Sequence, residues 1–158
     1  MYKDILSLLA LKGAYDFDTK RNLENARTND KDHTFPKSEF GSDKYINSIL
    51  NITWMSRDTN RKIKRYKRPS QYVKQFIADR YGDNEAEFLE VLDTHFINKK
   101  AYEYMLNDDF DRFIGERENE LILKIKELIG ISEPIQTQTL ITPNKPFSNK
   151  LAMWQSIE

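Results

Sequence analysis

The chain has 158 residues, which is long enough for one domain with a buried core and short for two. It contains no cysteine and only two histidines, so disulfides, thiol nucleophiles, cysteine-ligated zinc and multi-histidine metal sites are excluded. Any metal must then be held mainly by oxygen ligands, which favours a hard cation such as Mg²⁺ or Mn²⁺. The net charge is zero, so overall charge neither favours nor excludes nucleic acid as a partner.

The charges are unevenly distributed along the chain. Residues 61–80 contain eight Lys or Arg and one acid, whereas residues 83–127 contain thirteen acids and six bases. The basic run could face phosphate or could be a solvated helix face, and charge alone does not decide between the two. No stretch has the length and apolar character needed to span a membrane, and no cleavable leader pattern is evident, so we expect a cytoplasmic protein.

Short strands are predicted in the first half of the chain. A helix is expected over residues 4–12, followed by a small hairpin or irregular loop. The segment "KDHTF" (31–35) is predicted to be a short strand that ends at Pro36. "NITWM" (51–55) is predicted to be a second strand because of its β-branched and aromatic residues.

The second half is predicted to be helical. Ser56 is a candidate N-cap for a helix over residues 57–66, and Pro69 opens a helix that stops near Gly82. Further helices are expected over residues 84–95, 98–106 and 108–129. Apolar residues recur at helical spacing on the last of these and predict a buried stripe: Phe110, Phe113, Ile114, Leu121, Ile122, Ile125, Leu128 and Ile129.

These elements indicate an α+β fold that is mostly helical, with one domain over residues 1–130. Its core is a strand–loop–strand–helix unit over about residues 30–66, and residues 69–130 form the helical C-terminal half. Residues 131–158 contain three prolines and no periodicity, so we expect an extended or mobile tail there.

The predicted ββα unit could gather four polar residues at one end: Asp32, His33, Asn51 and Asn60. An imidazole can take a proton from water. A carboxylate and an amide oxygen suit Mg²⁺, which is usually held by few protein ligands and keeps several waters. A second amide can hydrogen-bond the imidazole and fix its orientation.

Simpler explanations exist for each of these residues. His33 could be a bystander, Asn51 a strand-start or turn residue, and Asn60 a surface residue of the helix. Two other residues that could suggest a site, His95 in an apolar run and Trp54 on the second strand, are interpreted as packing residues.

The segment "DHTFPKS" (32–38), followed by "INSILNITWMSRDTNRK" (46–62), resembles the motif of HNH nucleases, which have the ββα-metal fold. The family pattern is an Asp-His pair followed by Pro and Ser, a central Asn that opens the second strand, and an Asn or His nine residues later. Asn51 and Asn60 have that spacing. The joint order and spacing make this resemblance more specific than the Asp-His pair alone.

Two later segments extend the resemblance. "KRPSQYV" (67–73) and the helical segment 94–130 are similar to parts of the C-terminal nuclease domain of GmrSD-type restriction endonucleases. The resemblance therefore covers roughly residues 8–130. It implies an HNH ββα-metal core embedded in a helical scaffold, and a restriction- or defence-related DNA endonuclease that uses Mg²⁺ or Mn²⁺.

The resemblance also implies a role for each matched residue. His33 would be the general base, Asn51 would orient its imidazole, and Asp32 and Asn60 would be ligands of a single divalent metal. Beside such a motif, we interpret the basic run as a DNA phosphate-binding surface. Its residues are Arg61, Lys62, Lys64, Arg65, Lys67 and Arg68.

One departure from the family limits what can be transferred. Members commonly carry an N-terminal nucleotide-using domain, and the chain begins close to where the nuclease segment should start. Such a domain could be missing here or belong to a partner subunit, so dependence on a nucleotide is not transferred. The competing interpretation is a DNA-binding or assembly module that keeps the fold but does not cut.

Overall fold

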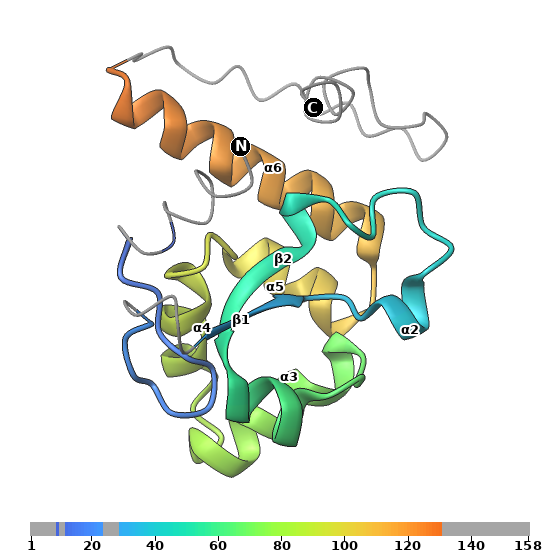
Figure 1. The fold of residues 1–158 in the computed structure, drawn as a ribbon. Helices are drawn as coiled ribbons and strands as arrows, with labels where there is room; N and C mark the ends of the chain where they lie inside the picture. The colour runs from blue at the N-terminus through green and yellow to red at the C-terminus, as the bar shows by residue number, and fades with distance from the viewer. Residues whose placement is uncertain (1–8, 10–11, 24–28, 131–158) are drawn as a thin grey trace.

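A small two-stranded sheet lies among helices (Figure 1). The computed structural model describes residue 9, residues 12–23 and residues 29–130. Strand β1 (Asn29–His33) pairs antiparallel with β2 (Ile52–Ser56), so that His33 lies opposite Ile52 and Asn29 opposite Ser56. The α+β class and the two predicted strands are therefore confirmed.

Both strands are displaced slightly from their predicted positions. The first begins two residues earlier and ends at His33, because Thr34 and Phe35 turn away from the strand and are hydrogen-bonded by Asn51. The second begins one residue later, because Asn51 belongs to a short 3₁₀ helix, η1 (Ile49–Asn51).

The helix after β2 completes a strand–strand–helix unit. Residues 57–58 are α-helical and continue into a π-helical segment, η2 (Thr59–Lys64). Ser56 Oγ accepts a 3.2 Å hydrogen bond from the Thr59 amide, which confirms Ser56 as the N-cap. The helix ends before residue 66 because Arg65 adopts a positive φ of 51°. Its amide donates to Asn60 O at 2.7 Å, the i to i−5 bond of a π turn.

The predicted helices of the second half are confirmed to within two residues at every end. Asparagine or aspartate side chains cap three of them by accepting a hydrogen bond from a backbone amide in the first turn: Asn84, Asn98 and Asp109. A further short helix, which was not predicted, lies in the connection between the strands. The bounds are α2 (Lys37–Phe40), α3 (Pro69–Arg80), α4 (Glu85–Asp93), α5 (Lys99–Leu106) and α6 (Phe110–Leu128).

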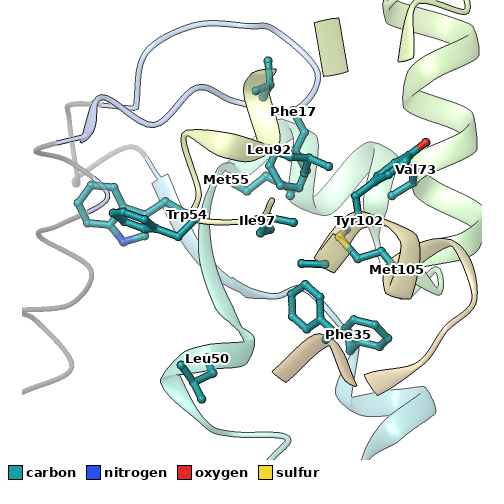
Figure 2. Close-up of a cluster of buried hydrophobic side chains, with 14 of the residues drawn as sticks. Phe17, Phe35, Leu50, Trp54, Met55, Val73, Leu92, Ile97, Tyr102 and Met105 are labelled. Carbon is teal, nitrogen blue, oxygen red and sulfur yellow. The ribbon is translucent and has the colours of Figure 1, made fainter. Parts of the chain in front are cut away.

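One hydrophobic core joins the sheet to these helices, and Figure 2 shows part of it. Trp54 is 9% exposed within this core, which confirms it as a packing residue. The apolar stripe of α6 was predicted correctly only in part. Its first members, from Phe110 to Leu121, are buried, but Leu128 and Ile129 are 59% and 62% exposed. They lie at the end of the helix, beyond the buried part of the stripe.

His95 is fully buried and has a structural role, as predicted. Its Nδ1 lies 2.6 Å from the Thr53 hydroxyl and its Nε2 lies 2.6 Å from the carbonyl of Tyr15. A carbonyl can only accept, so Nε2 carries the proton and Nδ1 accepts from Thr53. Burial lowers the pKa of His95 to about 4, so the ring is neutral at neutral pH.

Parts of the prediction fall on residues outside the described ranges. The tail over residues 131–158 lies there entirely, and the helix over residues 4–12 lies there except for Leu9 and Lys12, which are helical. Across residues 9, 12–23 and 29–130, no helix is long and apolar enough to cross a membrane.

Candidate active site

A pocket of about 500 Å³ lies where the end of β1 meets the start of η2 and the short helix α2. Three of the four residues proposed from sequence line it together, namely Asp32, His33 and Asn60. The fourth, Asn51, does not line it. The remaining lining residues are Pro36, Lys37, Ser38, Arg61, Arg65 and Tyr66.

The imidazole of His33 is half-buried at the pocket wall, and Asn47 contacts it. His33 Nε2 lies 3.4 Å from Asn47 Oδ1. With the proton on Nε2, this contact is a hydrogen bond to the amide oxygen, and the lone pair of the ring lies on Nδ1. Asn47 belongs to the connection between the strands, and no spacing rule in the sequence singled it out.

The prediction that Asn51 orients the imidazole directly is wrong. Asn51 is fully buried, and its amide nitrogen donates to Phe35 O at 3.0 Å and to Ile46 O at 2.9 Å. Its amide oxygen accepts from Phe35 N at 2.9 Å. Both of its amide protons are therefore used on backbone carbonyls. Asn51 fixes the turn that follows His33 and influences the imidazole only through the backbone.

The prediction that Lys64 binds phosphate is also wrong. Its side chain is 1% exposed, and Nζ lies 2.6 Å from Asp32 Oδ2 and donates to His33 O at 2.8 Å. The ring of Tyr72 lies 5.0 Å away on another side. Burial lowers the pKa of Lys64, while the Asp32 carboxylate opposes that shift. A side chain enclosed in this way cannot reach DNA.

Asp32 and Asn60 retain atoms that suit a small divalent cation. Asp32 Oδ2 is buried and forms an ion pair with Lys64, whereas the side chain as a whole is 15% exposed and lines the pocket. Of the two carboxylate oxygens, Oδ1 is therefore the one left for a ligand in the pocket. Asn60 Nδ2 donates to Asp30 at 3.3 Å, which leaves the amide oxygen as the atom for a metal.

A cation held here would have few protein ligands. Within the described ranges, no cluster of three or more His, Asp and Glu side chains could hold a metal. One carboxylate oxygen and one amide oxygen are a sparse set, but Mg²⁺ is often bound by one or two carboxylates and keeps several waters. The residues present fit such an ion.

Asp30 is a charged neighbour of the pocket that sequence reasoning missed. It accepts from Arg61, with Nε to Oδ2 at 3.0 Å and Nη2 to Oδ1 at 3.4 Å, and pairs with Arg57 at 3.5 Å. Arg61 thus reaches the pocket with its orientation fixed by a carboxylate. Arg65 lines the same pocket, is exposed, and donates to Arg61 O at 3.3 Å.

The other basic residues of the run, Lys62, Lys67 and Arg68, each have a partner within the protein. Lys62 is exposed and forms an ion pair with Asp58 one helical turn earlier, at 3.0 Å. Lys67 donates to a backbone carbonyl within the run. Arg68 is exposed and pairs with Glu39 at 2.9 Å. Surface pairs of this kind are weak and can exchange for phosphate.

Comparison with known proteins adds one relative. The chain is 35% identical over 150 residues to an uncharacterized protein of Methanocaldococcus jannaschii, and the match covers 82% of this chain and 26% of that protein. The chain therefore spans about a quarter of the length of the relative that it matches. No protein-family model matches the chain, and no solved structure gives a significant match.

Proposed function

We propose that this chain is a metal-dependent DNA endonuclease with an HNH-type ββα core. The observation that carries the proposal is the shared pocket: the adjacent Asp32 and His33 of β1 line it together with Asn60, which comes from the helix after β2, and with two arginines. The two antiparallel strands and the helix after β2 also come in the order that the HNH motif in the sequence predicts.

In this proposal His33 is the general base. Its Nδ1 takes a proton from a water molecule, and the contact of Nε2 with Asn47 keeps the ring in the matching tautomer. The hydroxide oxygen bonds to the phosphorus of a phosphodiester, the bond from phosphorus to the 3′ oxygen breaks, and the 3′ oxygen leaves with the electron pair and takes a proton from solvent. The proton on the imidazole is then lost to solvent.

Asp32, through Oδ1, and the amide oxygen of Asn60 would hold Mg²⁺ or Mn²⁺. When bound, the ion supplies Lewis-acid stabilisation of charge that grows on the phosphate and the leaving oxygen. Arg61 and Arg65 add positive charge at the wall of the pocket, where a phosphate would lie. Lys62 and Arg68 extend this positive surface outside the pocket.

The proposal includes DNA as partner and a cytoplasmic, restriction- or defence-related role. An N-terminal nucleotide-using domain, or a partner subunit that carries one, is an additional proposal that follows from the family resemblance. The match to the archaeal protein, which covers about a quarter of that protein, is compatible with such a domain elsewhere.

A second candidate function is a DNA-binding or assembly module that does not cut. The contact between Lys64 and Asp32 favours it, because an ammonium 2.6 Å from Oδ2 already neutralises the carboxylate that should hold the metal. We favour the nuclease because Oδ1 is still left for a ligand in the pocket and because a binding module has no need for His33 beside it.

The deciding experiment is a plasmid-nicking assay on the purified chain. Mg²⁺, Mn²⁺, Ca²⁺ and EDTA are compared in parallel, with His33→Ala as the matched variant. Nicking that requires Mg²⁺ or Mn²⁺ and is lost in His33→Ala supports the nuclease. DNA binding without any cleavage under these conditions supports the non-cutting module.

A further inference from the structure

Lys64 contacts both the proposed metal ligand and the backbone of the proposed base. Its ammonium lies 2.6 Å from Asp32 Oδ2 and donates a 2.8 Å hydrogen bond to the carbonyl of His33. The ring of Tyr72 lies 5.0 Å from the same ammonium. A buried cation is tolerated only when it is paired in this way, so these three contacts fix the position of Nζ.

This position determines which oxygen of Asp32 is available in the pocket. Oδ2 is buried and faces Lys64. The Asp32 side chain nevertheless lines the pocket and is 15% exposed. Because Oδ2 is buried, Oδ1 is the carboxylate oxygen left for a cation in the pocket. The carboxylate can thus serve a cation with one oxygen only, unless the pair with Lys64 breaks.

Divalent cations differ in how they use a carboxylate. Ca²⁺ takes more oxygen ligands, at longer distances, and often binds both oxygens of one carboxylate. Mg²⁺ requires a compact octahedral shell and keeps several of its waters, so one oxygen from a carboxylate suffices. A carboxylate that is held as a one-oxygen ligand therefore suits the smaller ion.

We propose that Lys64 is a positioning residue that holds Asp32 as a one-oxygen ligand and thereby makes the site selective for Mg²⁺ or Mn²⁺ over Ca²⁺. The inference rests on the proposed function in one respect, that Asp32 is a metal ligand. The same ammonium also donates to the carbonyl of His33, so it connects the proposed metal ligand, Asp32, to the backbone of the proposed base.

The test is metal binding by Lys64→Met, measured by calorimetry for Mg²⁺ and Ca²⁺ and by electron paramagnetic resonance for Mn²⁺. Methionine keeps most of the side-chain length and removes the charge. The affinity for each dication should rise about tenfold, because loss of a unit charge beside a dication is worth that much even when strongly screened. Ca²⁺ affinity should rise further than Mg²⁺ affinity, because Ca²⁺ can bind the second carboxylate oxygen that Lys64 no longer occupies. The control is Lys124→Met, a partly exposed lysine of α6 paired with Glu127, which should change neither affinity.

An unchanged ratio of Mg²⁺ to Ca²⁺ affinity in a folded Lys64→Met protein overturns this inference while leaving the nuclease proposal intact. A wild-type chain that binds none of the three ions instead removes the metal part of the proposed function. If Lys64→Met does not fold, nuclear magnetic resonance of the wild-type Lys64 ammonium decides. Its slowly exchanging signal should persist when Mg²⁺ binds, and its loss on Mg²⁺ binding would mean that the metal displaces the lysine.

Discussion

Asn51 and Phe35 are joined by a reciprocal pair of hydrogen bonds: Phe35 N donates to Asn51 Oδ1 at 2.9 Å, and Asn51 Nδ2 donates back to Phe35 O at 3.0 Å. The backbone of Asn51 adds a third link, since its carbonyl accepts from Thr34 N at 2.7 Å. The two residues that follow His33 are therefore held by Asn51, Thr34 through its backbone and Phe35 through its side chain, just before β2 begins. Asn51 thus shapes the chain beside the pocket without lining it.

We expect Asn51→Ala to lower the free energy of unfolding by about 3 kcal/mol, because it leaves buried backbone groups of Phe35 and Ile46 without partners. Urea denaturation measures this loss. Asn47→Ala, which truncates an exposed asparagine of the same connection, should cost no more than about 0.5 kcal/mol. Equal losses in the two variants would contradict the structural role assigned to Asn51.

His95 predicts a dependence of stability on pH. Burial lowers its pKa to about 4 in the folded protein, while an unfolded histidine has its ordinary value of about 6.5. Between these values the unfolded chain binds the proton and the folded chain does not, so stability falls as pH falls through that window. At about 1.4 kcal/mol per pH unit, the loss from His95 approaches roughly 3 kcal/mol near pH 4.

Two measurements check this prediction. The free energy of unfolding from urea titrations should decline as the pH is lowered from 7 to 4. In the folded protein the ring resonances of His95, assigned by their retention in His33→Ala, should not titrate above about pH 5. A ring that titrates between pH 6 and 7 in the native protein would show that His95 is not held neutral by burial.

The exposed part of the basic run predicts the salt dependence of DNA binding. Arg65→Gln and Lys62→Gln should each weaken binding to all sequences alike and reduce the slope of log affinity against log salt by about 0.9. The matched control is Lys124→Gln on α6, which loses the same charge far along the chain from the pocket. If the slope equals the wild-type value in both variants, these basic residues do not contact phosphate and form only a solvated surface.

Local signals in the sequence were sufficient for the two strands and the longer helices, but not for α2, η1 or the π-helical form of η2. Strand composition, the Ser56 cap and the position of Pro69 each act within a few residues, and the structure agrees with all three. The convergence of His33 and Asn60 was predictable as well, because two adjacent strands and the following helix leave few arrangements.

The sequence was misleading where a residue's environment depends on distant chain segments. Lys64 lies in a run of exposed bases, and only the approach of Asp32 and Tyr72 makes it buried. Asn51 was correctly singled out, but an amide can serve many partners. Its hydrogen bonds with Phe35 depend on how the turn after β1 packs, and the spacing of residues in the sequence does not predict them.

The remaining prediction separates the general base from the metal ligands. A positioned general base contributes about a hundredfold to ten-thousandfold in rate, so His33→Ala should lose most cleavage while its Mn²⁺ affinity remains near the wild-type value. Asn60→Ala should instead weaken Mn²⁺ binding, and part of its activity should return at high Mn²⁺. Asp32→Ala should behave like Asn60→Ala in metal binding. It also leaves the Lys64 ammonium unpaired, so it should be less stable than Asn60→Ala.

Rates of plasmid nicking across a Mn²⁺ titration, with metal affinity measured on the same preparations, distinguish these roles. Cleavage by His33→Ala at the wild-type rate would mean that another group activates the water. A loss of Mn²⁺ affinity in His33→Ala as large as in Asn60→Ala would make the imidazole a ligand instead of a base. We expect neither result, because the contact of His33 Nε2 with Asn47 leaves Nδ1 as the nitrogen that can accept a proton, and Asp32 Oδ1 and Asn60 are the oxygen donors suited to the ion.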